Sequence, residues 1–350
     1  MKNFKIILLS ALTFGVTSVF AQQEFQFGNY THNPFLFNPA AGGLTEFSQI
    51  DLGYRNQHIS ADGNPVTMYM SGSTSIRFKD NKSAAKVFNP DGEMMYAPPL
   101  NSVGSYKHVL GGRLVSDGIG PFQKTGVMAT YAVHLPMTDK INFGAGLGLG
   151  WNNIGINPSK VIVYSESDDI LQSFGSRWNQ NNLDLQAGLI FYTDRLTVGL
   201  SSTQLLANKL KFSDAYSVSK FNSHWMLYSS YKWDVAPDFV IEPFAMVRAV
   251  KHAPISADLG ANFHYKYVWI GAQYRTSRSV VASVGLNFLK NFYVSYAFEY
   301  SAKSTRISTA GTHEVQLGVY FGKSKKAAAR EAAKDAPIES TEGNEETLED

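Results

Sequence analysis

Histidine is the side chain most often used for acid–base and metal chemistry near neutral pH, so its placement is a first test for catalysis. The chain has eight histidines, and they are scattered, one to a predicted strand or loop. No pair has the spacing of metal ligands, and no nucleophile elbow accompanies them. We therefore expect no catalytic residue, no metal site and no cofactor.

The glycines at 144, 146, 148 and 150 are the second pattern that could do chemistry. A Gly-x-Gly run binds dinucleotides where a strand turns into a helix, whereas this run lies inside one alternating segment. From Ile141 to Trp151 every second residue is apolar, and the residues between them are asparagine or glycine. Since side chains alternate between the faces of a strand, one face is an apolar wall about ten residues long, enough to cross a bilayer when tilted. The run therefore predicts a membrane-spanning strand in which Leu147 and Leu149 face lipid and the glycines face inward.

The same alternation recurs along most of the chain. Strands are predicted near 48–56, 66–78, 104–116, 122–136, 140–152, 181–193, 194–203, 220–233, 238–250, 255–265, 267–276, 279–289, 291–301 and 311–321. Their number, about fourteen, is even, as in closed bacterial barrels. The predicted fold is all-β: a closed antiparallel transmembrane β-barrel with short periplasmic turns and longer extracellular loops.

Connection lengths give an independent check on this topology. With both chain ends in the periplasm, the periplasmic connections are the tight turns at 137–139, 193–194, 234–238, 266 and 290–291. The longer pieces fall on the extracellular side, at 57–65, 153–180, 204–219 and 302–310. Residues 79–103 break the pattern as a long periplasmic connection.

The chain ends predict the compartment. Lys2 and Lys5 precede an apolar run, and Ala21 completes a small-residue cleavage site, so residues 1–21 are predicted to be a secretory signal peptide. Residues 22–47 are expected to form an N-terminal periplasmic or lumenal segment, residues 48–322 the barrel, and residues 323–350 a disordered periplasmic tail. The predicted location is the cell outer membrane, with its lipid as one partner.

Composition narrows the function further. The formal net charge is +2 and charged residues make up 17%, which argues against nucleic acid as a partner. The absence of cysteine excludes a disulfide framework and a Cys-ligated zinc site.

Several short motifs stand outside the alternation. They contribute Asn38, Pro39, Gly42, Tyr54, Arg55, Asn56, Gln57, Asp62, Gly63, Pro65, Thr67, Asp117, Gly120 and Pro121. In order and spacing they resemble the PorP/SprF family of outer-membrane proteins of the type IX secretion system of Bacteroidetes. The chain departs from the usual pattern at His58, where the family commonly has tryptophan, and in its long tail after the last strand.

The resemblance implies a non-enzymatic barrel that works with the periplasmic ring or motor components of the secretion machine. It would serve the export or cell-surface attachment of cargo proteins, including adhesins used for gliding motility. In physical terms, Asn38-Pro39 and Asn64-Pro65 fix turns, because proline presets its own dihedral and extends the preceding residue. Whether those turns hold the N-terminal segment against the barrel wall or are ordinary rigid turns is open at this stage.

An outer-membrane porin for small solutes is the alternative function. The predicted inward-facing charges have mixed sign: Arg55, Asp184, Glu242, Arg248, Asp258, His264, Arg275, Glu299 and Glu314. Such a set can line an open channel or cross-link a closed lumen. Inward glycines at 144–150 leave space that residues 22–47 or 79–103 are expected to fill, unless the glycines only allow the strand to bend.

Overall fold

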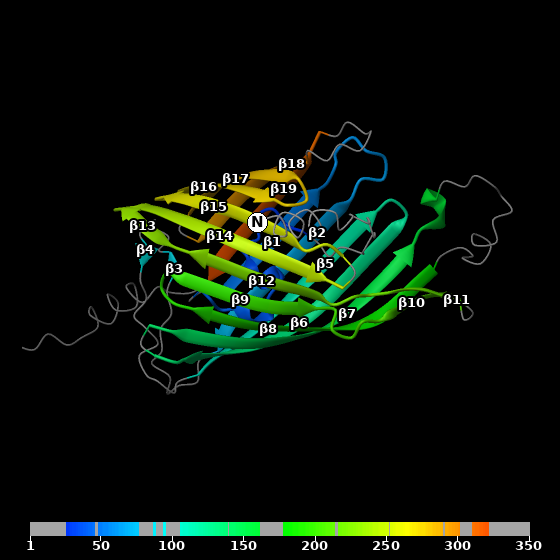
Figure 1. Ribbon diagram of the computed structural model, residues 1–350, viewed down its shortest axis with the longest axis horizontal. Coiled ribbons are helices and arrows are strands. Elements are labelled where there is room, and N and C mark those ends of the chain that lie inside the picture. The colour runs from blue at the N-terminus through cyan, green and yellow to red at the C-terminus, as the bar shows by residue number, and fades with distance from the viewer. Residues whose placement is uncertain are drawn as a thin grey trace, which may run out of the picture.

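The computed structural model is a closed antiparallel β-barrel of fourteen strands (Figure 1). It describes residues 26–45, 48–76, 87–88, 94–95, 106–138, 140–161, 178–213, 216–251, 253–289, 291–301 and 310–321. No helix among these residues is long and apolar enough to cross a membrane. The predicted signal peptide and the tail lie outside the described residues.

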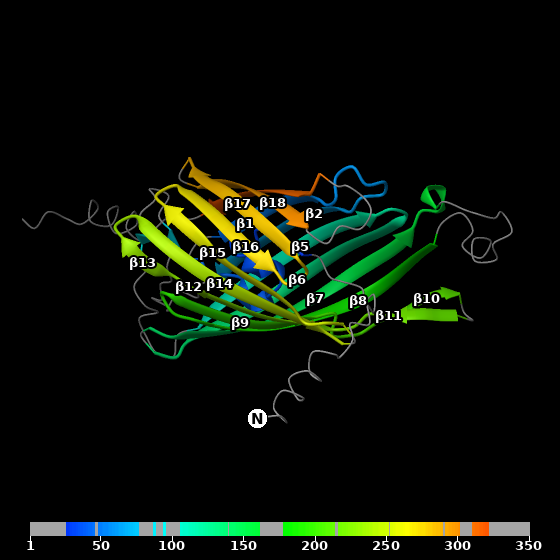
Figure 2. The ribbon, with the colours of Figure 1, turned by 45° about the horizontal axis from the view of Figure 1, so that its top comes forward.

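The barrel strands follow one another around the wall in chain order. They are β1 (Ser48–Asn56), β2 (Val66–Ile76), β5 (Lys107–Ile119), β6 (Phe122–Pro136), β7 (Asn142–Ile156), β8 (Trp178–Tyr192), β9 (Leu196–Thr203), β12 (His224–Tyr231), β14 (Phe239–Val250), β15 (Ser256–Tyr265), β16 (Val268–Arg275), β17 (Ser279–Phe288), β18 (Phe292–Ser301) and β19 (Thr312–Phe321). Strand β1 pairs with β19 and closes the ring (Figure 1). Figure 2 shows the strands running obliquely around the wall. Because every strand has two neighbours, the barrel leaves no long open edge.

Small elements complete the described chain. They are the 3-10 turns η1 (Pro34–Leu36), η2 (Pro39–Ala41) and η3 (Pro158–Lys160), the short strand pairs β3 (Val87–Phe88) with β4 (Met94–Met95) and β10 (Lys209–Ser213) with β11 (Tyr216–Lys220), and β13 (Trp233–Ala236), which pairs with β14. We call the end of the barrel with the β1–β2, β5–β6 and β18–β19 connections the long-loop rim, and the opposite end the short-turn rim.

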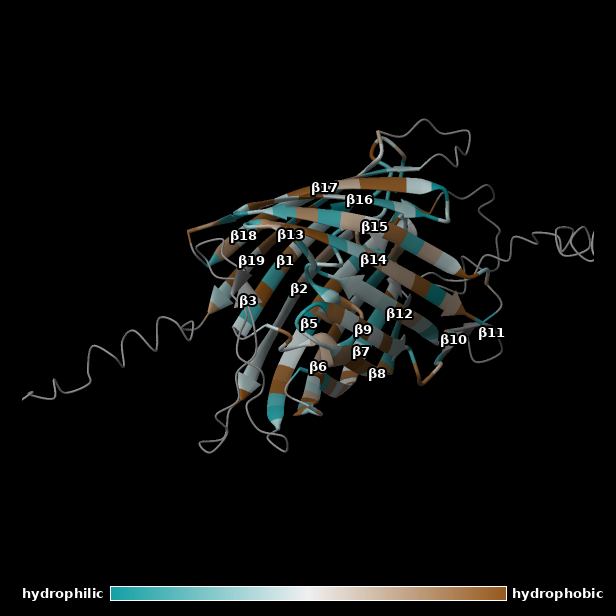
Figure 3. Ribbon diagram, turned by 60° about the vertical axis from the view of Figure 1, so that its left-hand side comes forward, coloured by the Kyte–Doolittle hydropathy of each residue, from teal (hydrophilic) through white to brown (hydrophobic). Residues whose placement is uncertain are grey.

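The predicted inside-out alternation is confirmed. Leu147 and Leu149 are 60% and 62% exposed on the outer face, whereas Gly146 and Gly148 are buried. Figure 3 shows apolar and polar bands alternating along the strands. A shift of one residue would turn glycines toward lipid and leucines toward the lumen, so the hydrophobic pattern fixes the register.

The predicted strand at 220–233 is wrong at its start, because the chain first makes the hairpin β10–β11 and enters the barrel only at His224. The strand also breaks after Tyr231. The last pair with the facing strand β14 is Ser230 with Phe244, and the next residue of β14, Pro243, has no N–H to donate to the ladder. The peptide N–H of Lys232 faces the other neighbour, β9, and donates to the Arg195 carbonyl at 2.8 Å. Pairing resumes in β13, within the stretch that the sequence predicted as a turn at 234–238.

Loop lengths also differ from the prediction. Strand β7 continues to Ile156 and β8 begins at Trp178, which shortens the predicted 153–180 loop. At the same rim, β5 and β6 are joined by Gly120 and Pro121 alone. The long-loop rim therefore also carries tight turns.

Glycine and aromatic residues pair across neighbouring strands on the lumenal face. The pairs are Gly53 with Tyr69, Gly260 with Phe244, Gly285 with Trp269, and Gly318 with Tyr293. In each pair the ring lies over the glycine, so that a Cβ at Gly285 would come within 2.1 Å of Nε1 of Trp269. Glycine is required there because any side chain would meet the ring.

Candidate functional site

Residues 26–45 lie inside the barrel, and we call this segment the plug. It packs through η2 against β6, β7, β8 and β9. A Cβ at Gly146 would lie 2.6 Å from the amide nitrogen of Ala40 and 2.7 Å from the carbonyl carbon of Pro39. The expectation that an inward glycine makes room for residues 22–47 is thus confirmed at Gly146. At Gly148 the space is taken by the Met128 side chain instead.

The Asn38-Pro39 motif fixes the plug to the wall. The Asn38 carboxamide oxygen accepts from the amide of Ala40 at 2.9 Å and caps η2, where Pro39 occupies the first turn. The same side chain donates to the carbonyl of Leu189 in β8 at 3.0 Å. Gly42 leaves room for the Phe35 ring, which would lie 3.1 Å from a Cβ. The Asn38-Pro39 turn therefore holds the N-terminal segment against the barrel wall and is more than an ordinary rigid turn.

Wall side chains from several strands satisfy the plug's backbone carbonyls. Gln186 donates to the carbonyl of Phe37 at 2.7 Å and Gln273 to that of Gly28 at 3.3 Å. Arg113 donates to Leu36 and Lys107 to Gly43. A segment without regular structure can stay buried only if such groups are paired, so these donors make the plug a fixed part of the fold.

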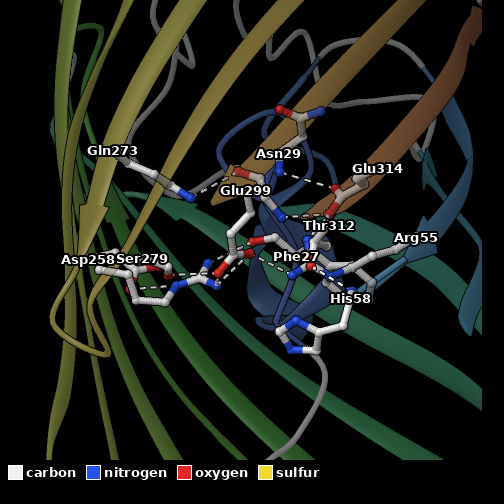
Figure 4. Close-up of polar contacts among 12 residues, drawn as sticks. Phe27, Asn29, Arg55, His58, Asp258, Gln273, Ser279, Glu299, Thr312 and Glu314 are labelled. Atoms are coloured by element: carbon white, nitrogen blue, oxygen red, sulfur yellow. Dashed lines mark hydrogen bonds and ion pairs between the residues drawn. The ribbon is translucent and has the colours of Figure 1, made fainter. Parts of the chain in front are cut away.

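A buried carboxylate holds the first residues of the plug (Figure 4). Glu314 of β19 accepts from the amides of Gly28 at 2.7 Å and Asn29 at 3.1 Å. It also accepts from the guanidinium of Arg55 at 2.9 Å, and Arg55 reaches Glu299 at 2.7 Å. Charge-assisted hydrogen bonds of this kind are stronger than neutral ones, so Glu314 is the main anchor of this end of the plug.

The ion pairs continue around the lumen from Glu299. Arg275 donates to Glu299 at 2.9 Å and to Asp258 at 3.2 Å, and it also reaches the carbonyl of Phe27 at 3.3 Å. Arg248 makes a bidentate pair with Asp258 at 2.8 and 2.9 Å. With Arg55 and Glu314 the network holds three arginines and three carboxylates, so its formal charges cancel. The predicted inward charges therefore cross-link a filled lumen.

Three predicted inward residues lie outside this network. Glu242 accepts from His264 at 3.2 Å, and Asp184 accepts from Asn152 at 3.3 Å. Both carboxylates are buried, which confirms their predicted side of the wall. Among the described residues, no group of three or more histidine, aspartate or glutamate side chains is placed to hold a metal ion.

Aromatic contacts seat the plug against the glycine-paired rings. Phe27 meets Tyr69 edge-on at 4.8 Å between centroids, and the imidazole of His32 stacks on Trp269 at 3.7 Å. Burial, followed by the nearby His264, lowers the pKa of His32 to about 3, so the stacked ring is neutral near pH 7. The plug is therefore docked by stacking as well as by ion pairs.

The remaining motif residues gather at the long-loop rim, apart from the plug. They are Asn56, Gln57, Asp62, Gly63, Pro65, Thr67, Asp117, Gly120 and Pro121. Hydrogen bonds join them across segments: the amide of Gln57 to the carbonyl of Pro65 (2.8 Å), that of Gly120 to Gly63 (3.0 Å), that of Asn157 to Pro121 (2.8 Å), the Thr67 hydroxyl to Asp117, and Asn64 to Asn56. Tyr54 faces outward at 42% exposure. Asn64-Pro65 shapes this rim, and among the described residues no hydrogen bond joins it to the plug.

Sequence reasoning missed the wall donors Lys107, Arg113, Gln186 and Gln273, and the stacking partner Trp269. Each lies on the inward face of a strand in which inward and outward side chains alternate. This alternation was the signal in the sequence that could have identified them as inward-facing. Alternation does not show which inward side chain meets the plug, because this depends on how far each strand is staggered around the barrel.

Several known proteins are similar to this chain in structure or in sequence. Solved structures similar to the chain include the Ralstonia pickettii toluene transporter TbuX (10% identity, 82% of this chain and 93% of that chain, TM-score 0.46) and the Pseudomonas putida toluene transporter TodX (11% identity, 84% and 95%, TM-score 0.43). Acinetobacter baumannii outer membrane protein Omp33 is another (11% identity, 79% and 99%, TM-score 0.43). No curated protein matches the sequence. The family model described as type IX secretion system membrane protein PorP/SprF matches residues 19–319.

Proposed function

Since the chain belongs to the PorP/SprF family of type IX secretion system membrane proteins, we propose that it is a non-enzymatic outer-membrane component of that machine. Its role is to support the export or cell-surface attachment of cargo proteins. Adhesins used for gliding are one class of cargo suggested by the sequence resemblance. A signal peptide at residues 1–21 would deliver it to the outer membrane and stays a prediction.

The plugged lumen is the observation that favours this role over a porin. A solute channel needs a continuous watery path, whereas here the plug is bonded to the wall through Glu314, Gln186 and Asn38. The cavity beside the plug, lined by Phe27 and Arg113 among others, measures about 30 Å³, room for one or two water molecules. A barrel filled in this way suits an anchor or docking component.

Periplasmic ring or motor components are the partners that we infer at the short-turn rim. Short turns leave little protein surface there, so the 79–103 connection and the basic start of the tail, residues 323–334, are the proposed contact regions. Both lie largely or wholly outside the described residues. Truncation after Gly322 is expected to leave the barrel assembled, because β19 already ends at Phe321.

Two measurements separate the proposed role from a porin. Deleting the gene should remove a specific subset of proteins from the secreted and surface proteomes. The purified full-length protein in a planar bilayer should show no steady conductance. Stable solute-sized conductance together with unchanged proteomes would establish the porin and reject the secretion role.

A further inference from the structure

The loop from residue 57 to 65 has an unusual backbone. His58 and Ser60 have positive φ angles of 52° and 81°, and Gly63 follows with 69°. Residues other than glycine rarely adopt this left-handed backbone conformation, because their Cβ crowds the neighbouring backbone. Two such residues within three positions persist only where surrounding contacts hold them.

Those contacts come from two other connections of the long-loop rim. Ile59 exchanges backbone hydrogen bonds with residues 310–311: its amide donates to the carbonyl of Gly311, and the amide of Ala310 donates to its carbonyl, each at 3.0 Å. Gly63 accepts from the amide of Gly120 at 3.0 Å, and a Cβ at Gly63 would come within 3.1 Å of the Gly120 Cα. The loop is thus held as a rigid block.

The block presents side chains that have no use inside the fold. His58, Ser60 and Asp62 are exposed, and within the described chain their side chains make no hydrogen bond or ion pair. The imidazole of His58 points away from the ion-pair network (Figure 4). A rigid, strained loop that only closed a hairpin would not need three free polar groups, so the arrangement points to recognition.

An apolar pair stands beside these groups at the tip of the β5–β6 turn. Ile119 and Phe122 face each other across that turn and are 49% and 52% exposed. The alternation of β5 and β6 puts both on the lumenal side of the wall, where inward neighbours such as Asp117 also point. They therefore face the water at the barrel mouth and not lipid. Adjacent apolar side chains exposed to water, unlike scattered single ones, are a feature of interaction sites.

We propose that His58, Ser60, Asp62, Ile119 and Phe122, which we call the rim platform, form a docking surface for a secreted or surface-attached protein. This inference rests on the proposed function and supplies its contact site. The platform has an apolar part flanked by polar groups, as protein interfaces do. Its rigid backbone limits the entropy lost on binding. The partner surface that fits has an apolar side chain for Ile119 and Phe122 and a cationic or N–H donor group for Asp62.

The first test asks whether the platform faces the outside of the cell. The natural chain has no cysteine, so Ser60→Cys introduces one unique thiol. A membrane-impermeant maleimide should label this variant in intact cells. No labelling, with the barrel assembled as judged by heat-modifiable migration, would overturn the proposal.

The second test measures cargo. The probe is the set of surface proteins lost on deletion of the gene. The double change Ile119→Ser with Phe122→Ser should lower these proteins at the cell surface by roughly tenfold or more, the size expected for interface anchors. Ile255→Ser is the matched control, because Ile255 is 70% exposed in the β14–β15 connection of the same rim, and it should leave cargo unchanged.

The outcomes separate the two levels of argument. If deletion of the gene changes no surface protein, the proposed function fails. If deletion removes cargo while the assembled double variant retains it, only the rim platform is wrong. Equal losses in the double variant and the Ile255→Ser control would also reject the platform, because the effect would not be specific to it.

Discussion

Replacing Glu314 with glutamine should release the plug without unfolding the barrel. Glu314 is fully buried and accepts from Gly28, Asn29 and Arg55. The glutamine side chain keeps one acceptor oxygen, but its NH2 group would face the N–H donors whose hydrogen bonds the carboxylate accepts. Arg55 is then left with Glu299 as its remaining partner in this network. The contacts that the plug itself loses are the hydrogen bonds from the amides of Gly28 and Asn29 to the carboxylate, and a hydrogen bond to a charged group contributes about 1.5–3 kcal/mol. At about 1.4 kcal/mol per factor of ten, the displaced plug becomes roughly tenfold to a hundredfold more populated.

A single thiol in the plug reports on this change. Ala41 is 5% exposed, so Ala41→Cys should react slowly with maleimide in detergent or in vesicles, and Glu314→Gln should accelerate the reaction by roughly tenfold to a hundredfold. Asp238→Asn is the matched control. It removes one exposed carboxylate at a φ of 65°, which asparagine tolerates. Unchanged labelling in an assembled Glu314→Gln barrel, with no new conductance, would refute the anchoring role of this carboxylate.

Three further outcomes follow from the geometry. Leu147→Arg should cost about 2–4 kcal/mol near the bilayer midplane, and normal heat-modifiable migration with unchanged urea resistance would contradict the register. Gly146→Ala should speed plug labelling, because its Cβ would meet plug backbone at 2.6 Å, whereas Gly148→Ala meets a flexible methionine and should not. Burial and His264 lower the pKa of His32 to about 3 in the docked plug, so the displaced plug binds protons more readily. Docking is therefore at full strength above about pH 6.5 and weakens as pH falls toward 3. His32→Phe, which keeps the stacking, should weaken this dependence, and an equal pH response in both proteins would contradict it.

The membrane-facing pattern was accessible from sequence because strands have a period of two. Leu147 outward and Arg55 inward follow from alternation alone, and both are confirmed. The start of β12 was not accessible, since the preceding hairpin β10–β11 also reads as short alternating strands. The strand break was missed for another reason. It depends on Pro243, which is eleven residues along the chain from Lys232 and meets this part of the wall only when β12 and β14 pair.

The plug illustrates a second limit of sequence reasoning. The glycines at 144–150 predicted free space, and the mixed inward charges allowed a cross-linked lumen. Which segment fills the space depends on contacts between residues such as Gly28 and Glu314, which are 286 positions apart. Such contacts exist only after the barrel has closed with a particular stagger, and local periodicity carries no information on stagger.

Closure of the barrel and docking of the plug share the same residues. Arg55 of β1 and Glu314 of β19 are directly opposite in the pairing that closes the ring, and this pair forms one of the ion pairs of the network. When β1 and β19 pair, Arg55 therefore reaches the Glu314 carboxylate, which accepts the hydrogen bonds from the amides of Gly28 and Asn29. The plug immediately precedes β1 in the chain, so its first anchoring side chain, Glu314, is brought to the strand that the plug leads into. A plug added after closure would have to enter past the three arginines and three carboxylates that already bridge the lumen, and each broken pair would leave a buried charge without its partner. The geometry thus favours a plug that is built in as the barrel closes, and the filled lumen is a consequence of the fold itself.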